Sequence, residues 1–231
     1  MKKIVVFTGA GMSAESGIRT FRDSGGLWEE YEIKDVATPE AWARNPELVT
    51  QFYNQRRKQM MESSPNEGHL ALARLETKYD VSIITQNVDD LHERAGSSHV
   101  MHLHGELSKC RSTADPNLVY DVYGWELTAE SKCELGSRLR PHIVWFGEEV
   151  PMMIPAIQIT MLSDIFIIIG TSLEVYPAAS LASRAPTDSL KYYVDPNANS
   201  LSNINHLTIV REKSGIALPK LVDELLSMST G

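Results

Sequence analysis

Cysteine is nearly absent from this sequence, which contains only Cys110 and Cys133 among its 231 residues. Two cysteines cannot build the disulfide framework of a small secreted domain, so we expect a protein of a reducing, cytoplasmic compartment. Long apolar runs are missing as well. The longest, IFIIIG at 165–170, is far shorter than the roughly 20 residues that span a bilayer. The apolar stretch after the N-terminal lysines is too short for a signal peptide, so we expect no contact with a membrane.

Basic residues are outnumbered in this chain. Lys and Arg total 22 and Asp and Glu total 30, which gives a net charge of −8. No run of basic residues offers the electrostatic stripe that nucleic-acid binding requires, so we expect no nucleic-acid partner. An acidic surface can instead attract basic peptides. The hydrophobic content of 42% is enough to bury a substantial core in a chain of this length.

Short runs rich in β-branched residues recur along the chain, and Gly, Asn or Asp stops each of them. They lie at 4–9, 81–87, 165–170 and 192–197 and predict buried strands of a parallel sheet. Helical patterns occupy 39–61, 66–78 and 217–228. This alternation predicts an α/β fold with a Rossmann-like, doubly wound sheet, which binds ligands at the carboxyl ends of its strands.

Residues 106–142 interrupt the alternation, because turn residues and scattered aromatics replace the regular patterns. They indicate a smaller inserted module, and we therefore expect two domains. The Rossmann-like domain would comprise 1–28, 65–105 and 143–231, and the small domain would comprise 29–64 and 106–142.

The first predicted strand is followed by GAGMSA at 9–14, which fits the pattern G-x-G-x-x-A. Glycines at such a turn let the backbone approach a pyrophosphate, and the N-terminus of the helix that follows stabilises the phosphate charge. A tight packing turn without a ligand is the alternative.

Five segments in chain order, the first of which contains GAGMSA, resemble the sirtuin family of NAD-dependent protein lysine deacylases. They are GAGMSAESGIRTFRD at 9–23, TQNVDDLH at 85–92, HLHGE at 102–106, RPHIVWFGE at 140–148 and GTSLEVYP at 170–177. The resemblance implies the sirtuin fold and NAD as cofactor. It also implies removal of acyl groups from lysine side chains of other proteins, giving nicotinamide, O-acyl-ADP-ribose and free lysine.

The resemblance also implies the residues that bind NAD. They are Gly9, Ala10, Gly11, Ser13, Ala14, Thr20, Phe21, Arg22, Trp28, Gln86, Asn87, Asp89, Gly170, Thr171, Ser172, Asn197 and Ala217. Phe21 would shield the reacting centre from water, although an isolated phenylalanine is more often a core residue. Asn87 and Asp89 would contact the ribose and the nicotinamide, and the same two residue types also cap helices.

The catalytic residues implied by the resemblance are His104 and Asn87. An imidazole with a pKa of about 6.5 can accept a proton from a ribose hydroxyl at neutral pH. His102 would be supporting or structural, and His92 would be packed or would cap a helix.

The peptide substrate would lie as an added strand between two segments. The residues implied are Val144, Phe146, Gly147, Glu148, Val175 and Tyr176. Without the resemblance, VWFG at 144–147 is simply a buried strand.

Tyr53 and Arg56 are three residues apart in the helical pattern, so they share one face. This Y-x-x-R resembles the signature of class III sirtuins, which prefer succinyl and malonyl groups. A guanidinium can bind such a carboxylate through two hydrogen bonds, and a tyrosine hydroxyl can add a third. The alternative is a solvated basic helix face, because Arg57 and Lys58 follow directly.

Sirtuins usually hold a structural zinc on two C-x-x-C pairs. Here Thr113 takes the place of the second cysteine after Cys110, and Cys133 has no cysteine partner. Two thiolates cannot complete a four-ligand site, so we expect no metal. Apolar packing would replace it, with Leu118, Val119, Tyr120, Val122, Tyr123, Trp125, Leu127 and Leu139 as candidates.

Three other functions use the same residues. An ADP-ribosyltransferase or NAD glycohydrolase would need only the NAD site, a plain deacetylase would ignore Tyr53 and Arg56, and a nucleotide-sensing module would have no turnover. The peptide segments favour deacylation over the first, and Asn87, Asp89 and His104 together speak against the last. We expect a monomer.

Overall fold

The computed structural model describes residues 1–18, 27–28, 31–200 and 204–228. A six-stranded sheet forms its centre, in the order β11-β10-β9-β1-β4-β5, and all neighbouring strands are parallel. The strands are β1 (Lys3–Thr8), β4 (Asp80–Thr85), β5 (Val100–His102), β9 (Ile165–Ile169), β10 (Leu190–Val194) and β11 (Leu207–Val210). The predicted strands correspond to β1, β4, β9 and β10, which are the four central ones.

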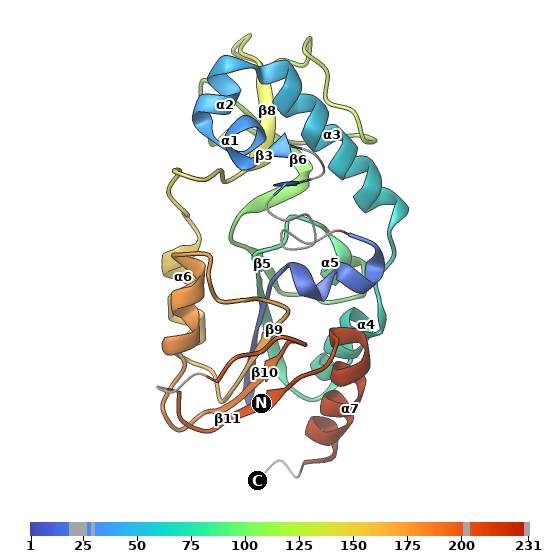
Figure 1. The fold of residues 1–231 in the computed structure, drawn as a ribbon, viewed down its shortest axis with the longest axis vertical. Coiled ribbons are helices and arrows are strands. Elements are labelled where there is room, and N and C mark those ends of the chain that lie inside the picture. Colours follow the sequence, from blue (N-terminus) through green and yellow to red (C-terminus); the bar gives the residue numbers. More distant parts are fainter. Residues whose placement is uncertain (19–26, 29–30, 201–203, 229–231) are drawn as a thin grey trace.

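Helices cover both faces of this sheet, as predicted for a doubly wound fold. One face carries α4 (Glu67–Arg74) and α7 (Ser214–Ser227), and the other carries α6 (Met153–Thr160) and the 3-10 helix η4 (Ala178–Ser183). Figure 1 shows α6 on one side of the strands and α4 with α7 on the other. Along β1, Ile4 and Val6 enter the first core while Val5 and Phe7 enter the second. Each such side chain contributes about 1.5–3 kcal/mol by leaving water.

The helical pattern predicted at 39–61 is divided into two helices. The first, α2 (Pro39–Arg44), ends one residue before α3 (Pro46–Glu62) begins. Pro46 disfavours the helical conformation at Asn45, and the side chain of Asn45 accepts the Leu48 N–H and so caps α3. The helical pattern predicted at 66–78 ends earlier than expected, because α4 is followed by a 3-10 turn, Leu75–Thr77. Two further short helices are α1 (Ile33–Val36) and α5 (Leu91–Arg94).

A three-stranded antiparallel sheet forms the inserted module at the far end of the molecule from the C-terminus (Figure 1). Its order is β7 (Val119–Asp121), β6 (Gly105–Ser112) and β8 (Leu139–Ile143). A small antiparallel pair, β2 (Leu27–Trp28) and β3 (Tyr31–Glu32), precedes α1.

Apolar packing holds the module together, as predicted, although not with every predicted residue. Leu127 and Leu139 form a cluster with both cysteines, and Leu118, Tyr120 and Val122 pack against it. The prediction is wrong for three residues, Val119, Tyr123 and Trp125, which are 38%, 93% and 41% exposed. On the edge strand β7, the side chain of Val119 points away from the face that Tyr120 uses.

Arg57 belongs to this packing and not to a solvated helix face. Its side chain is 1% exposed and donates to the carbonyl oxygens of Leu107 and Trp125. Asn54, one turn earlier on α3, exchanges two hydrogen bonds with the backbone of Leu127. Burial lowers the pKa of Arg57 to about 10. The two side chains therefore clamp the inserted module to α3.

A third core lies between α1–α3 and the strands β6 and β8. It buries Val36, Ala37, Ala41, Val49, Phe52, Tyr53, Met60, Leu107, Ile143 and Trp145. This core positions Tyr53 and Trp145 side by side. Within the described residues, no helix is long and apolar enough to cross a membrane.

Candidate active site

Three of the predicted motifs meet at the carboxyl ends of β1, β4 and β9, which are neighbours in the sheet. They are, in order, the segments that begin GAG at 9, TQNVD at 85 and GTS at 170. The Gly11 N–H donates to the Gly170 carbonyl at 2.8 Å. The side-chain amide of Gln86 donates to the Thr171 hydroxyl at 3.1 Å. Segments that are far apart in the sequence thus form one edge, where an α/β sheet binds its ligands.

Backbone contact between the first and third motifs explains their glycines. A Cβ on Gly11 would lie 2.7 Å from the Cα of Gly170, and a Cβ on Gly9 would lie 2.7 Å from the Cβ of Thr171. Gly170 itself has φ +59, a conformation that side chains disfavour. The glycines therefore serve tight packing as well as any phosphate contact.

The helix predicted after GAG is wrong. Two short 3-10 turns follow instead, Ala10–Met12 and Ala14–Ser16, and they are joined at Ser13. Neither is long enough to present a helix dipole. Ala10 and Gly11 are half-buried and Ala14 is exposed, so any direct phosphate contact would come from the local backbone.

Ser13, Asn87 and Asp89 form a buried hydrogen-bond network beneath the turns. The Asn87 amide donates to the Ser13 hydroxyl at 3.0 Å, and that hydroxyl donates to one Asp89 oxygen at 3.0 Å. The other Asp89 oxygen accepts the Leu91 N–H. One Asp89 oxygen thus bonds the first residue of α5, although the N-cap position itself is Asp90, and the other bonds Ser13. Burial raises the pKa of the Asp89 carboxyl.

His104 lies on the short connection between β5 and β6, half-buried at the same edge of the sheet. Its Nδ1 is 3.1 Å from the Gln86 carbonyl oxygen. A carbonyl only accepts, so Nδ1 carries the proton and Nε2 has a free lone pair. Burial lowers the pKa of His104 below its usual value, so the imidazole is neutral at pH 7. These are the properties of a general base.

His102 differs from His104, as expected of a supporting residue. Its Nδ1 donates to the Asn87 carbonyl at 3.0 Å, and its Nε2 is 2.8 Å from a Glu93 carboxylate oxygen. Burial opposes its charge, but the hydrogen bond and charge of Glu93 outweigh burial and raise the pKa of His102. The sequence carried no signal for Glu93, because this pairing depends on how α5 packs beside β5.

His92 is packed beneath the site, as predicted. It is 1% exposed, and its Nε2 lies 3.1 Å from the hydroxyl of Thr8 at the end of β1. His69 packs against it with ring centroids 4.8 Å apart. His69 was not predicted, because an isolated histidine in a helical pattern has no distinctive spacing.

The predicted peptide segments lie beside this edge on two loops. After β8, Phe146 is 46% exposed, and after β9, Val175 and Tyr176 are 37% and 75% exposed. Val144 is half-buried and its N–H donates to the His104 carbonyl at 2.9 Å. The alternative of a buried strand at 144–147 is wrong, because β8 ends at Ile143 and the exposed loop follows.

The Glu148 carboxylate has partners within the protein. It accepts from Arg140 at 2.7 and 3.1 Å and from the Trp145 backbone N–H at 2.8 Å. Arg111 adds two longer contacts at 3.3 and 3.4 Å. Glu148 thus holds the loop that would meet a peptide.

Tyr53 and Arg56 lie on α3 and are 1% and 6% exposed. The indole N–H of Trp145 donates to the Tyr53 hydroxyl at 3.1 Å. The Arg56 guanidinium carbon lies 5.7 Å from the centre of the Phe52 ring. The alternative of a solvated basic helix face is therefore wrong for Arg56 as well as for Arg57.

The residues expected on the adenosine side are spread along the sheet edge. Thr171 is buried and Ser172 half-buried, and the Asn197 N–H donates to the Asp195 carboxylate at 2.8 Å. The Ala217 side chain is 5% exposed and packs in the first core. Thr20, Phe21 and Arg22 lie outside the described residues, and Trp28 is described only as part of β2.

Within the described ranges, no three His, Cys, Asp or Glu side chains are grouped so that they would hold a metal ion. The Cys133 sulfur instead lies 3.3 Å from the Ser112 hydroxyl and 3.0 Å from the Ser137 hydroxyl. Cys110 is buried nearby in the same apolar cluster.

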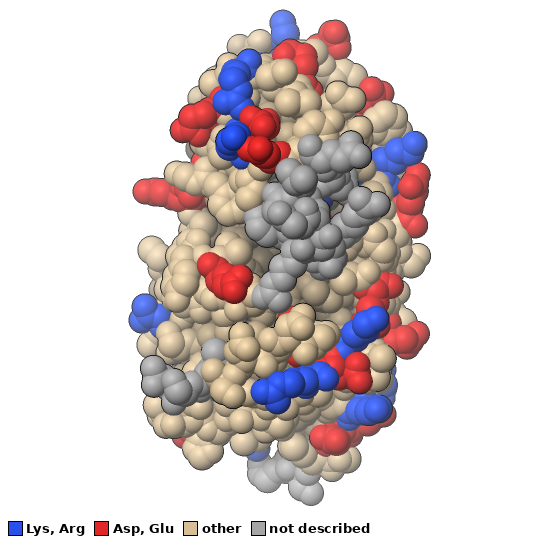
Figure 2. Space-filling model, viewed as in Figure 1, with Lys and Arg blue, Asp and Glu red and all other residues tan. Residues whose placement is uncertain are grey.

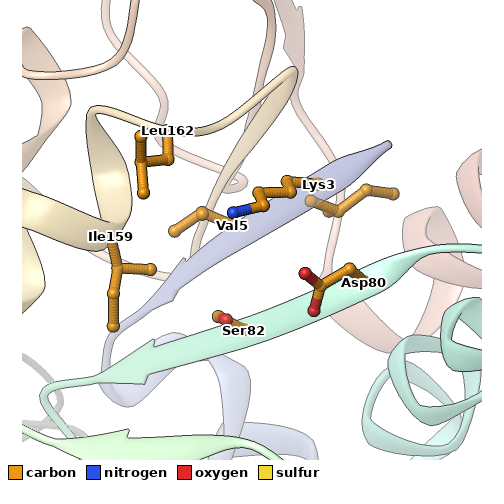
Figure 3. Close-up of a pocket in the computed structure, with 7 residues that line it drawn as sticks. Lys3, Val5, Asp80, Ser82, Ile159 and Leu162 are labelled. Atoms are coloured by element: carbon orange, nitrogen blue, oxygen red, sulfur yellow. The ribbon is translucent and has the colours of Figure 1, made fainter. Parts of the chain in front are cut away.

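Two hollows lie away from this edge of the sheet, and the larger, of about 630 Å³, is lined by residues of α3 and by 125–130 of the inserted module. A small cavity of about 90 Å³, lined by Lys3, Asp80, Ser82, Ile159 and Leu162 among others, opens at the amino ends of β1 and β4 (Figure 3). On the face drawn in Figure 2, acidic and basic side chains are interspersed.

At the carboxyl ends of β1, β4 and β9, the site brings together hydroxyl, amide and carboxylate groups. These are the groups that ribose and pyrophosphate require, so the residues present fit NAD.

Comparison with known proteins agrees with this geometry. A family model described as the Sir2 family matches residues 9–177. A protein of Helicobacter pylori named NAD-dependent protein deacylase is 52% identical over 232 residues, covering 100% of this chain and 98% of its own. A protein of the same name from Bacteroides thetaiotaomicron is 48% identical, covering 98% and 99%.

Two solved structures show a similar fold. A Sir2 homologue in complex with NAD has a TM-score of 0.89 at 39% identity, covering 97% of this chain and 90% of its own. A Sir2 variant with a deacetylated p53 peptide and 3′-O-acetyl ADP-ribose has a TM-score of 0.82 at 29% identity, covering 96% and 92%.

Proposed function

This chain belongs to the Sir2 family and is an NAD-dependent protein lysine deacylase, and we propose that it removes succinyl and malonyl groups in preference to acetyl groups. NAD supplies the electrophilic ribose carbon when it is bound. The protein's own contributions are to bind and orient the cofactor, to move a proton and to select the acyl group.

Proton transfer falls to His104. Its Nε2 lone pair is held in place by the Nδ1 bond to Gln86 and can accept a proton from a ribose hydroxyl. Asn87 would orient a hydroxyl or water, since its side-chain NH₂ donates to Ser13 and its backbone carbonyl accepts from His102. Gly9, Gly11, Ser13, Thr171 and the rest of the sheet edge would hold the cofactor.

The proposed acyl preference depends on one observation: Tyr53 and Arg56, three residues apart on α3, are both buried, and the Tyr53 hydroxyl contacts Trp145 of the loop after β8. A carboxylate that enters between them meets a guanidinium and a phenolic hydroxyl in a place sheltered from water. Each hydrogen bond to a charged group contributes about 1.5–3 kcal/mol. An acetyl group has no carboxylate and gains nothing from these two side chains.

The test compares Arg56→Met with Lys58→Met. Both remove a cation from α3, but Lys58 lies over the outward-facing Trp125 ring, with its Nζ 5.7 Å from the ring centre. We expect Arg56→Met to lower the succinyl-to-acetyl ratio of kcat/KM about tenfold or more. Lys58→Met should leave the ratio within twofold. An unchanged ratio in Arg56→Met would show that the assignment is wrong.

The alternative enzyme activities are separated by following two products. Peptides that carry acetyl-, malonyl- or succinyl-lysine are incubated with and without NAD, and nicotinamide and deacylated peptide are measured together. We expect the two products in equal amounts. Nicotinamide without deacylated peptide would favour an NAD glycohydrolase.

Three further points stay predictions. They are a monomeric state, a cytoplasmic location and the division into two domains at the boundaries given above.

A further inference from the structure

Tyr53 and Trp145 meet in the core between α3 and the loop after β8. The indole Nε1 lies 3.1 Å from the phenolic oxygen, and the side chains are 1% and 3% exposed. An indole nitrogen can only donate a hydrogen bond. Tyr53 is therefore the acceptor in this bond, and its own proton points elsewhere.

That proton has no acceptor among the residues that the structure describes. Within them, the Tyr53 hydroxyl makes one hydrogen bond, and in that bond it accepts from Trp145. A hydroxyl donor that is shut off from water without an acceptor costs about 1–3 kcal/mol. The cost is removed when a ligand brings an acceptor atom to the hydroxyl.

The surroundings favour an anionic acceptor. Arg56 is close enough to act on the charge state of the Tyr53 hydroxyl. Burial dominates, however, and raises the pKa of Tyr53 well above its usual value. The hydroxyl therefore keeps its proton at neutral pH and can donate it in a hydrogen bond to a carboxylate.

The indole of Trp145 is itself fixed from its other side. The Arg140 guanidinium carbon stacks 3.2 Å from the centre of the ring. Glu148 binds this guanidinium and also accepts the backbone N–H of Trp145. Arg140 and Glu148 thus determine where the indole N–H points.

We propose that Trp145 is a positioning residue for acyl selectivity, because its Nε1–H occupies a lone pair of Tyr53 and directs the tyrosine proton toward the distal carboxylate of a succinyl or malonyl group. This inference rests on the proposed function, since it explains how the same site distinguishes an acidic acyl group from acetyl. Without the indole donor, the hydroxyl can rotate and present a lone pair to the carboxylate.

The variant that tests this is Trp145→Phe in the full chain, which keeps a ring under Arg140 but removes the N–H. With one peptide carrying succinyl- or acetyl-lysine, we expect kcat/KM for succinyl to fall about five- to tenfold, mainly through KM. The value for acetyl should stay within twofold. Trp42→Phe is the matched control, because Trp42 packs against Trp145 with ring centroids 5.8 Å apart while the hydrogen bond to Tyr53 comes from Trp145.

A double-mutant cycle separates positioning from packing. Once Tyr53→Phe has removed the hydroxyl, adding Trp145→Phe should cause no further loss with succinyl. A packing role would instead lower both substrates alike and give additive losses, which would overturn the proposal.

A spectroscopic readout covers the case in which Trp145→Phe fails to fold. The chain has four tryptophans, so a ¹H–¹⁵N spectrum holds four indole N–H signals. We expect one of them to move upfield in Tyr53→Phe as its acceptor is lost. Four unmoved signals would overturn the proposal.

Failure of the proposed function gives a different result. A wild-type enzyme without any preference for succinyl would overturn the acyl assignment and this inference together. A wild-type preference that survives Trp145→Phe unchanged would overturn only the role of Trp145.

Discussion

The Nδ1 atom of His104 lies 3.1 Å from the carbonyl oxygen of Gln86, and this contact leaves Nε2 as the basic atom of the ring. Burial lowers the pKa of the imidazole. A general base is inactive when it is protonated, so a lowered pKa extends activity toward acid. We predict that kcat/KM of the wild type holds its plateau below pH 6.5 and declines only under more acidic conditions.

Replacement of His104 tests the same assignment. His104→Ala should reduce kcat by a factor of about 10²–10⁴, the usual contribution of general base catalysis. NAD binding, followed by calorimetry, should change little because the network of Ser13, Asn87 and Asp89 stays intact. Near wild-type turnover in this variant would remove His104 from the mechanism.

The buried pair His69 and His92 predicts acid sensitivity of the fold. Burial lowers the pKa of His69 to about 4 and that of His92 well below its usual value. From about pH 6.5 downward the unfolded chain therefore binds protons that the folded chain does not, so the free energy of unfolding decreases as the pH is lowered. Above pH 6.5 both histidines are neutral in both states, and the protein keeps its full stability.

His69→Gln isolates one member of the pair. A glutamine oxygen can still accept the Asn66 N–H that His69 Nδ1 accepts at 3.3 Å. Urea unfolding at pH 7 and pH 5 should show that the variant loses about 1–2 kcal/mol less than the wild type over this interval. Equal losses in the two proteins would mean that His69 is not the titrating group.

The clamp of Arg57 predicts a large stability effect away from the chemistry. Arg57→Met leaves the Leu107 and Trp125 carbonyls without their donor, and we expect a loss of about 2–4 kcal/mol in the free energy of unfolding. Lys58→Met, the next residue on α3, should cost about 0.5 kcal/mol or less. Comparable denaturant midpoints for the two variants would contradict the clamp.

Zinc is predicted to be absent from the inserted module. Elemental analysis of purified protein should find far less than one zinc per chain, and a chelator should leave the thermal midpoint unchanged. Stoichiometric zinc would contradict the apolar packing of Cys110 and Cys133 as the replacement for the metal.

The central strands could be predicted because both of their faces are buried, as the continuous apolar run at Ile165–Ile169 shows. The edge strands β5 and β11 were not predicted, since their half-buried residues give no continuous apolar run. The break at Asn45 was missed although Pro46 signalled it, because the apolar periodicity continues across it.

The site could be predicted as a set of motifs but not as a set of contacts. The meeting of Gly11 with Gly170 follows from the order of strands, which a single sequence does not state. The bond between Tyr53 and Trp145 joins residues 92 positions apart. Burial of Arg57 depends on carbonyl groups of the inserted module, which no local pattern encodes.

The acyl preference is tested most directly by the wild-type enzyme on one peptide sequence carrying either succinyl-lysine or acetyl-lysine, with NAD in excess and deacylated peptide measured by mass spectrometry. We predict a kcat/KM for the succinyl peptide at least about tenfold above that for the acetyl peptide, corresponding to one or more hydrogen bonds to a charged group. Equal values, or a higher value for acetyl, would contradict the assignment of Tyr53 and Arg56.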